Sequence, residues 1–575
     1  MKFIRINMYN LSVQVEEVPE NYKNIGGRGI TSSLINEEVS PICDPLGKNN
    51  KLIFAPGLLS GTNLVNTSRV SVGAKSPLTG TIKESNAGGT IGSALGSMGI
   101  SAIIFEGIPQ DNSSFIIKFD ENGEVYFLDA DEYKENRTYT FVRTLMEKHG
   151  DQYSVLCIGP AGENLMTSAS IQSSDTEGRP CRSAARGGLG AVMGSKGIKG
   201  IMLPKRAKKA PIYGNQDEFN AAAKSFAGAV KNHPFSGEVL PNFGTANLVA
   251  LINSAGAFPS YNATKGVFDQ WEKISGESLV TNIQNRGGKV KHQGCSQCII
   301  MCSNEYLDNE GKYLTASLEY ETIWAMGGMI GIDNLDIIAE LDYFCDDFGL
   351  DTMNTGTAIA VAMDAQYATF GDIKGLYDLL EEITNFTDLG KSLGNGPVDA
   401  GRYLNHNRIP AVKGQSIAAY DPRAIQGNAV TYATSPMGAD HTAGNTIGAN
   451  LDSIGGTLNP LKAEGQVEAS RNAQITMALL DTLGICIFAG MGLAEKSMQE
   501  DLLQLINSKC SIELSLEDMW KIGIQVLINE KDFNKRAGFK NKDDRLPNFF
   551  YSEPLPPHNT VVVVSEEDLD RTLQF

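Results

Sequence analysis

The sequence lacks any apolar run long enough to cross a membrane. Its longest run of valine, leucine and isoleucine alone is Val561–Val564, whereas a membrane-spanning helix needs about 20 apolar residues. Positive charge is also scarce, because 49 Lys and Arg stand against 67 Asp and Glu and leave a net charge of −18. Nucleic-acid binding requires a basic face. We therefore expect neither a membrane nor a nucleic acid as a partner, and the strand-like start without an apolar signal core favours a cytoplasmic location.

Cysteine is too sparse and too unevenly placed for a disulfide scaffold, with only nine residues in the chain. Three of them form the tight group Cys295-x-x-Cys298-x-x-x-Cys302, and Cys486 is a candidate fourth member. Four thiolates suit either an iron–sulfur cluster or a structural zinc ion. No second cysteine pair and no nearby histidine follow Cys302, so the spacing favours a cluster. A zinc-stabilised binding protein without enzymatic activity remains the alternative.

Glycine is abundant, with 60 residues, against about 7% of an average chain. Many of the glycines gather with arginines in three segments of the first 200 residues, at 26–29, 69–89 and 182–196. Backbone amides of glycine and guanidinium groups both bind phosphate well. None of the segments has the spacing of a P-loop or of a dinucleotide-binding turn. They predict a large phosphorylated cofactor rather than a nucleotide.

The pattern of apolar residues changes from strand-like to helical near residue 208, which predicts an α+β protein. We expect a β-rich, cofactor-cradling domain at 1–208 and two mostly α-helical domains at 209–418 and 419–575. The basic segment Lys199–Lys209 at this boundary is a linker or a docking patch for an acidic protein. The expected strands are Phe3–Ile6, Lys51–Phe54, Ala102–Phe105, Ser114–Phe119 and Val155–Ile158. The expected helices are Asp217–Asn232, Glu319–Gly328, Asn334–Phe348, Ile373–Thr384, Val467–Leu483 and Leu502–Ile506.

One short pattern occurs twice, although no repeat of fixed period is visible. Asp346-x-x-Gly349-Leu350 and Asp481-x-x-Gly484-Ile485 each follow a helical stretch, with glycine where a helix C-cap is expected. The second copy runs directly into Cys486. The duplication predicts a paired binding role.

Together these motifs are similar to those of the aldehyde:ferredoxin oxidoreductases, tungsten enzymes with a bis-pterin cofactor beside a 4Fe–4S cluster. The resemblance spans nearly the whole chain. It is carried by the segments Gly26–Gly29, Lys75–Gly80, Arg186–Lys196, Cys295–Cys302, Asp346–Asp351, Tyr420–Arg423 and Asp481–Cys486.

The resemblance implies a role for each motif. Cys295, Cys298, Cys302 and Cys486 would ligate the 4Fe–4S cluster. Asp346 and Asp481 would hydrogen-bond the two pterins, with Gly349, Leu350, Gly484 and Ile485 beside the rings. The pterin phosphates and the Mg²⁺ between them would be held by Arg69, Asn86, Gly88, Arg182 and Ala184, of which Asn86 and Ala184 would ligate the ion. The metal, tungsten or molybdenum, would need no protein ligand.

The resemblance also implies a catalytic pair. Glu321 matches the active-site glutamate, with Glu319 as the alternative, and His441 matches the active-site histidine. Glu321 would act as general base and His441 would hydrogen-bond the carbonyl oxygen. The implied reaction is oxidation of an aldehyde to a carboxylic acid, with electrons leaving through the cluster to ferredoxin or to a small iron–sulfur subunit.

The sequence departs from the family in two respects. Ile485 replaces the usual leucine, and none of the six histidines has a glutamate three positions before it. A homodimer bridged by a Glu-x-x-His metal site is therefore not expected. The alternative within the family is a catalytic subunit like that of benzoyl-CoA reductase, which reduces an activated aromatic and in which a cysteine reaches the metal. The segment after Glu321, TIWAMGGMIG, contains no cysteine and favours aldehyde oxidation.

Overall fold

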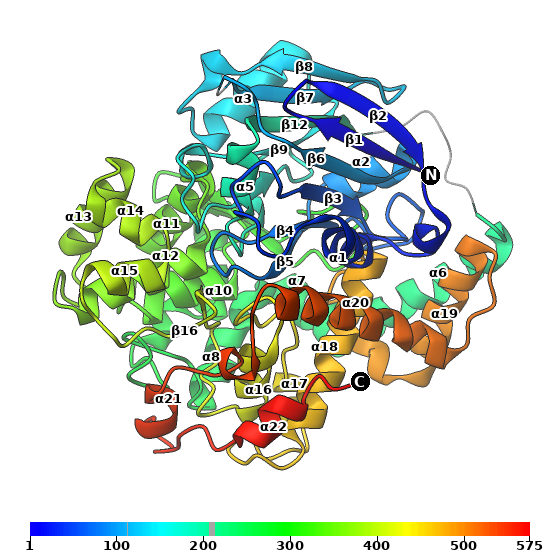
Figure 1. The fold of residues 1–575 in the computed structure, drawn as a ribbon. Coiled ribbons are helices and arrows are strands. Elements are labelled where there is room, and N and C mark those ends of the chain that lie inside the picture. Colours follow the sequence, from blue (N-terminus) through cyan, green and yellow to red (C-terminus); the bar gives the residue numbers. More distant parts are fainter. Residues whose placement is uncertain (112, 206–212) are drawn as a thin grey trace.

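The computed structural model describes residues 1–111, 113–205 and 213–575. Its N-terminal part consists of two six-stranded mixed sheets, in the orders β2-β1-β6-β3-β4-β5 and β11-β10-β9-β12-β7-β8 (Figure 1). The first half comprises β1 (Lys2–Asn7), β2 (Ser12–Glu17), α1 (Gly27–Glu38), β3 (Leu52–Pro56), β4 (Val70–Lys75), β5 (Ile82–Ala87), α2 (Ile91–Ser97) and β6 (Ile100–Glu106). The second comprises β7 (Phe115–Phe119), β8 (Val125–Asp129), α3 (Thr138–His149), β9 (Tyr153–Cys157), α4 (Pro160–Glu163), β10 (Ile171–Ser173), β11 (Arg182–Ala184), α5 (Leu189–Ser195) and β12 (Ile198–Pro204).

The two halves repeat one topology. Apart from the short helix α4 in the second half, each has a hairpin followed by a helix, a strand, a second hairpin, a short helix and a last strand that returns to the first hairpin. That last strand pairs parallel with the first, as β6 with β1 and β12 with β7. It pairs antiparallel with the central strand, as β6 with β3 and β12 with β9. One apolar core contains side chains of both sheets, so the halves form a single unit.

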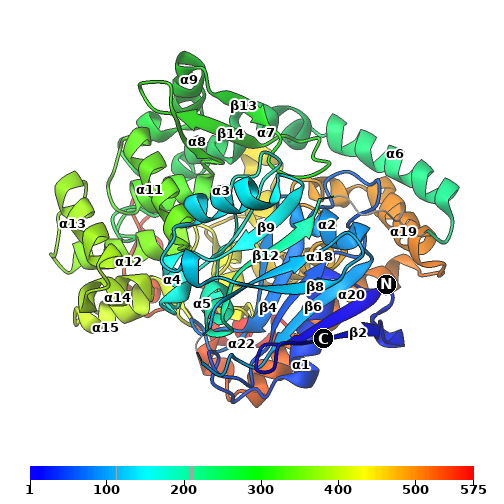
Figure 2. The same ribbon diagram turned by 90° about the horizontal axis from the view of Figure 1, so that it is seen from above.

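The rest of the chain is mostly helical and covers these sheets (Figure 2). Residues 213–418 form α6 (Gln216–Asn232), α7 (Leu240–Phe243), α8 (Leu248–Ser254), α9 (Gly276–Arg286), β13 (Lys289–His292), β14 (Ser303–Leu307), β15 (Tyr313–Ala316), α10 (Tyr320–Ile323), α11 (Leu335–Phe348), α12 (Thr352–Asp364), α13 (Ile373–Thr384), α14 (Asp388–Gly394), α15 (Pro397–Tyr403), β16 (Ala411–Val412) and β17 (Gln415–Ser416). Residues 419–575 form α16 (Gln426–Thr434), α17 (Ile447–Asn450), α18 (Gln466–Leu483), α19 (Lys496–Cys510), α20 (Leu516–Arg536), α21 (Phe549–Ser552) and α22 (Glu566–Arg571).

The α+β class and the expected elements are confirmed. The ends of each expected strand lie within two residues of those of an observed strand. The expected helices correspond to α6, α10 with the π-helix Trp324–Gly328 that follows it, α11, α13, α18 and α19. The longest helix, α20, was not expected. It packs between α1 and α18, so it joins the C-terminal part to the first sheet (Figure 1). The division at residue 418 stays a prediction, because the largest apolar core contains residues from both sides of it.

The basic segment at the boundary is only partly described. Lys199 belongs to β12, is fully buried and pairs with Glu163 at 2.8 Å, so this lysine is not part of a docking patch. Residues 206–212 lie outside the described residues. Within the described ranges, no helix is both long and apolar enough to cross a membrane.

Candidate active site

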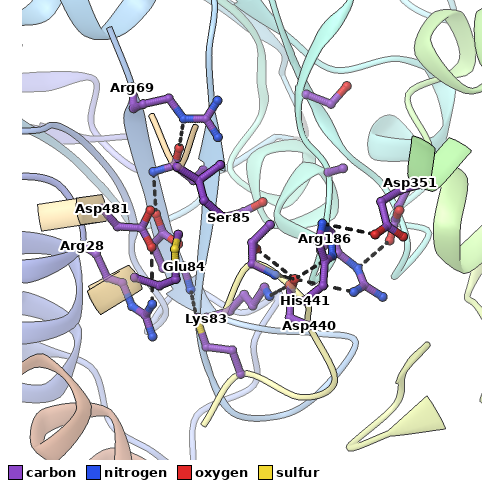
Figure 3. A pocket seen from close by; sticks show the side chains of 18 of the residues that line it. Arg28, Arg69, Lys83, Glu84, Ser85, Arg186, Asp351, Asp440, His441 and Asp481 are labelled. Carbon is purple, nitrogen blue, oxygen red and sulfur yellow. Dashed lines mark hydrogen bonds and ion pairs between the residues drawn. The ribbon is translucent and has the colours of Figure 1, made fainter. Parts of the chain in front are cut away.

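A cavity of about 220 Å³ lies where the two sheets meet the helical part of the chain. Buried charges of both signs line it and form two groups (Figure 3). One group surrounds Asp481, and the other surrounds His441. The expected residues that line the cavity are Arg69, Asn86, Glu321, His441, Asp481 and Ile485. Unexpected charged residues in its wall are Arg28, Lys83, Glu84, Arg186, Asp351 and Asp440.

The glycine of each Asp-x-x-Gly motif caps its helix and packs against a second glycine. Gly349 ends α11 with φ +82° and Gly484 ends α18 with φ +78°. A Cβ on Gly484 would lie 2.7 Å from the Gly57 Cα, and one on Gly349 would lie 2.7 Å from the Gly159 amide nitrogen. Gly57 follows β3 and Gly159 follows β9, the equivalent strands of the two halves. Each half of the sheet domain therefore holds one copy of the motif.

Asp481 lies among charges of both signs. Arg28 Nη1 is 3.4 Å from its carboxylate, and the same guanidinium binds Glu530 of α20 through Nε at 2.8 Å and Nη2 at 2.9 Å. Burial raises the pKa of Asp481 to about 8, and Glu84 adds to the rise, whereas Arg28 and Arg69 oppose it. A carboxyl group that readily holds or releases a proton is suited to hydrogen-bond the edge of an aminopyrimidine ring.

Asp346 occupies the equivalent place in the other half without a close arginine clamp. Its Oδ1 accepts a hydrogen bond from Ser183 Oγ at 3.3 Å. Burial and the nearby Asp342 raise its pKa well above the ordinary value, while Ser183 and Arg182 oppose the rise. Leu350 is buried beside it, and its amide bonds back to the Cys345 carbonyl at 2.8 Å.

The four expected cluster cysteines lie on one side of the site. Burial raises the pKa of Cys298 to about 11, and Cys295 and Cys486 contribute to the rise, so these thiols are neighbours. Gly89 N donates to Cys295 Sγ at 3.3 Å, and Asn66 Nδ2 donates to Cys298 Sγ at 3.2 Å. Burial raises the pKa of Cys302 well above its usual range, with Arg182 opposing.

The spacing of these thiols bears on the zinc alternative. Among the residues that the structure describes, no three His, Cys, Asp or Glu side chains lie close enough to hold one metal ion. Zinc needs each sulfur at about 2.3 Å from a single centre, whereas a 4Fe–4S cluster takes one thiolate on each of four iron atoms. Amide donors to the sulfurs are also typical of clusters. The donors to the Cys295 and Cys298 sulfurs fit a 4Fe–4S cluster.

The residues expected to hold the pterin phosphates come from both halves and meet near these cysteines. A Cβ on Gly88 would lie 2.7 Å from Cys295 Sγ and 3.2 Å from Arg69 Nη1, so a side chain at this position would displace the thiol or the guanidinium. Arg69 Nε donates to Asn86 Oδ1. The Arg182 side chain is only 11% exposed, and its buried Nε and Nη2 have no hydrogen-bond partner among the described residues. Ala184 follows it at the end of β11.

Buried donors without a partner are costly. A phosphorylated cofactor at this place would satisfy the Arg182 donors, and the glycines leave backbone open to it. The residues present therefore fit the expected group.

The structure brings Glu321 and His441 together. Glu321 Oε1 lies 3.4 Å from His441 Nε2, and its Oε2 accepts a hydrogen bond from the Ala419 amide at 3.0 Å. Burial raises the pKa of Glu321, and His441 opposes the rise. Glu319 does not line the cavity, because its carboxylate accepts from Thr245 Oγ1 at 2.6 Å and lies 3.6 Å from Arg182.

Sequence reasoning missed several charged residues of the cavity wall, although some signals were present. Arg28 and Arg186 belong to the glycine-rich segments, and Asp440 directly precedes His441. Asp351 follows Asp346 by five positions, as Cys486 follows Asp481. Lys83 also lies in one of these segments, at 69–89, but its contact with residue 440, 357 positions away, could not be predicted from it.

Comparison with known proteins follows the same division of the chain. The family model of the aldehyde ferredoxin oxidoreductase N-terminal domain matches residues 3–205, and the model of domains 2 and 3 matches residues 221–574. A tungsten-containing aldehyde ferredoxin oxidoreductase of Thermococcus kodakarensis is 34% identical over 99% of this chain and 94% of its own. One from Pyrococcus furiosus is 33% identical over 96% of this chain and 92% of its own.

A solved structure shows the same fold at lower identity. It is the active-site complex BamBC of benzoyl-coenzyme A reductase with 1,5-dienoyl-CoA. The TM-score is 0.81 at 18% identity, and the match covers 100% of this chain and 93% of the other.

Proposed function

Because the chain belongs to the aldehyde ferredoxin oxidoreductase family, it is an oxidoreductase, and we propose that it oxidises an aldehyde to a carboxylic acid. The reaction consumes the aldehyde and one water and releases the acid, two protons and two electrons. Ferredoxin or a small iron–sulfur protein would take the electrons. The observation that carries this proposal is the close pair of Glu321 and His441 in a cavity that is also lined by Asp481 and Ile485 of the second Asp-x-x-Gly motif.

The proposed cofactors are a tungsten or molybdenum bis-pterin, Mg²⁺ and a 4Fe–4S cluster. Asp346 and Asp481 would bind the pterins, and Arg69, Asn86, Gly88, Arg182 and Ala184 their phosphates and the Mg²⁺. When bound, the metal–pterin group supplies a Lewis acid and a two-electron acceptor. The unpartnered Arg182 donors and the crowded Gly88 support this assignment.

Glu321 would take a proton from the attacking water. Its Oε2 is fixed by the Ala419 amide, so Oε1 is the free oxygen and faces His441. Burial raises its pKa, which makes the carboxylate a stronger base than an exposed one. His441 Nε2 would receive that proton and hydrogen-bond the substrate oxygen as negative charge develops there.

Electrons would leave on the Asp481 side. Cys486 follows Asp481 by five residues, and its amide donates to the Asn66 carbonyl at 2.9 Å. Asn66 also donates to Cys298 Sγ. Asn66 therefore contacts two of the proposed cluster ligands, and one of them follows Asp481 closely in the sequence. With a pterin bound at Asp481, electron transfer to the cluster would require no movement of the chain.

Metal analysis of anaerobically purified protein tests the proposal. We expect tungsten or molybdenum together with about four iron atoms per chain, and reduction of ferredoxin or a viologen dye on addition of aldehydes. Zinc alone would contradict it. Turnover of an aromatic coenzyme A thioester without aldehyde oxidation would instead support the function of benzoyl-CoA reductase.

A further inference from the structure

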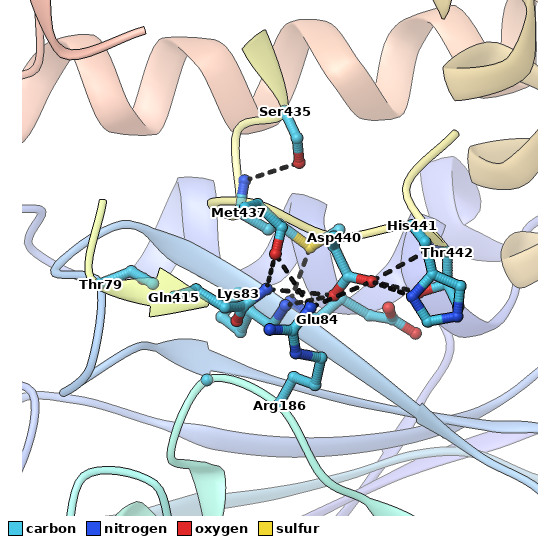
Figure 4. Close-up of polar contacts among 12 residues, drawn as sticks. Thr79, Lys83, Glu84, Arg186, Gln415, Ser435, Met437, Asp440, His441 and Thr442 are labelled. Atoms are coloured by element: carbon cyan, nitrogen blue, oxygen red, sulfur yellow. Dashed lines mark hydrogen bonds and ion pairs between the residues drawn. The ribbon is translucent and has the colours of Figure 1, made fainter. Parts of the chain in front are cut away.

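Asp440 is a buried carboxylate directly beside His441, with 4% of its surface exposed. Lys83, Arg186, Gln415 and Thr442 surround it (Figure 4). Its Oδ2 lies 3.4 Å from Lys83 Nζ and accepts from Gln415 Nε2 at 3.1 Å. Its Oδ1 accepts from the Thr442 amide at 3.0 Å and from Thr442 Oγ1 at 2.9 Å.

The two cations reach Asp440 from the two halves of the sheet domain. Lys83 belongs to β5 and is 1% exposed. Its stem packs on Gly187, where a Cβ would lie 2.5 Å from Lys83 Cγ. Arg186 follows β11, and its Nη1 lies 3.8 Å from Asp440 Oδ1 and donates to the Ala439 carbonyl at 3.0 Å. Both cations are therefore built into the fold rather than placed by flexible surface chains.

These contacts keep Asp440 charged inside the protein. Burial alone would raise its pKa, but Arg186, Lys83 and His441 hold that pKa well below the ordinary value. Burial lowers the pKa of Lys83, with Asp440 opposing. A carboxylate kept ionised by two cations has no simple role in packing, because an apolar residue would cost less to bury.

The imidazole of His441 lies between this carboxylate and Glu321. Its Nδ1 is 3.6 Å from Asp440 Oδ1, and its Nε2 is 3.4 Å from Glu321 Oε1. Tyr420 packs on the ring, with centroids 6.0 Å apart. Asp351 at the start of α12 also borders the cavity. The charged groups around His441 are thus Glu321, Asp351, Asp440, Lys83 and Arg186.

We propose that Asp440 is the positioning residue of His441, and that Lys83 and Arg186 limit the strength of its pull. Asp440 favours a proton on Nδ1, which leaves Nε2 to exchange a proton with Glu321. The two cations weaken the field of Asp440 at the ring, so that an imidazolium formed there gives up its proton again. This inference rests on the proposed role of His441, but its first measurement does not require turnover.

The proposal predicts that two variants shift the pKa of His441 in opposite directions. Asp440→Asn removes the anion and keeps the Thr442 bonds, so the pKa of His441 should fall by about one unit or more. Lys83→Met removes a cation, so the pKa of His441 should rise. The measurement is a pH titration of ¹³C-histidine NMR signals in the oxidised holoprotein. The chain has six histidines, and His441→Gln identifies the signal.

Lys413→Met is the matched control. Lys413 is also a buried lysine, with 2% of its side chain exposed, and it supports the same loop from the other side by donating to the Ala433 and Ser435 carbonyls at 2.8 and 3.2 Å. It does not line the cavity. The titration of His441 should not change in this variant.

Each outcome decides the proposal. Shifts of opposite sign in Asp440→Asn and Lys83→Met, with none in Lys413→Met, support it. Shifts of the same sign, or an equal shift in Lys413→Met, would show a merely structural effect and overturn it. In an active enzyme, the acid limb of the kcat profile should move with each His441 pKa. Opposite NMR shifts without aldehyde oxidation would instead contradict the proposed function alone.

Discussion

At the scale of single residues, the site is a set of charges taken out of water and balanced against one another. Arg28, Lys83 and Arg186 each face a carboxylate within 4 Å. Glu321 is the exception, since its partner His441 carries no permanent charge and its Oε1 has no hydrogen-bond partner among the described residues. An imperfectly compensated carboxylate is costly to bury. That cost is expected where a group must change its protonation state.

Glu321→Gln should therefore reduce kcat by about 10²–10⁴-fold while making the protein more stable at neutral pH. Burial raises the pKa of Glu321 in the folded state. At pH values above about 4.3, the pKa of glutamate in the unfolded chain, the folded protein therefore binds more protons at this group than the unfolded chain does. Ionisation then costs stability, and glutamine removes the cost. Parallel measurements of kcat and of the thermal midpoint from pH 5 to 8 should show a stability gain that grows with pH.

Glu319→Gln is the control for this experiment. Its carboxylate is bound by Thr245 and Arg182 outside the cavity, so the kcat of this variant should remain within about tenfold of the wild type. Full activity of Glu321→Gln at unchanged metal content would remove Glu321 from the proposed role. The same loss in both variants would indicate a structural effect on the short helix that carries them.

At the scale of elements, the ends of α11 and α18 carry the paired motifs. The sequence predicted both helices and their C-capping glycines, because a helical period followed by glycine is a local signal. It did not predict that Gly57 and Gly159 would pack on these glycines. Close contact between two backbones requires glycine on both sides, and nothing local identifies the partner.

Gly484→Ala should destabilise the protein more than an equivalent change elsewhere. Alanine must adopt φ +78° and place its Cβ 2.6 Å from Ser60 Oγ and 2.7 Å from Gly57 Cα. The left-handed conformation costs about 1–2 kcal/mol and the crowding about 1–3 kcal/mol more. Gly455→Ala is the control, because that residue has φ +90° and open space around it. Thermal midpoints should fall in the order wild type, Gly455→Ala, Gly484→Ala, and equal midpoints for the two variants would contradict the close contact.

At the scale of the whole molecule, the sequence predicted the succession of β-rich and helical parts but not the duplicated topology. The halves share their strand order while differing at equivalent places. The second residue of α1 is Arg28, and the second residue of α3 is Tyr139. When two halves share their backbone topology but not their side chains at equivalent places, the sequence shows no repeat. The pairing of Arg28 with Glu530 was equally hidden, because 502 positions separate them.

That pairing ties the two ends of the chain together, and it should make α20 essential to the sheet domain. The Glu530 and Arg28 side chains are 0% and 1% exposed. Arg28→Met would leave Glu530 without its cation, at a cost of about 3–5 kcal/mol. Arg28→Met combined with Glu530→Met leaves no unpaired partner in α20 and should cost less than the sum of the single changes.

Thermal unfolding and hydrogen exchange in α1 and α20 would measure this coupling. Tyr139→Phe is the control at the equivalent place of the other half. Tyr139 pairs with the Tyr313 hydroxyl at 3.1 Å and carries no charge, so its loss should cost only about 1 kcal/mol. If Arg28→Met were no more harmful than Tyr139→Phe, the buried pair would not hold the ends together. A larger effect, with faster exchange in both α1 and α20, would show that the two halves differ in how they are anchored as well as in what they bind.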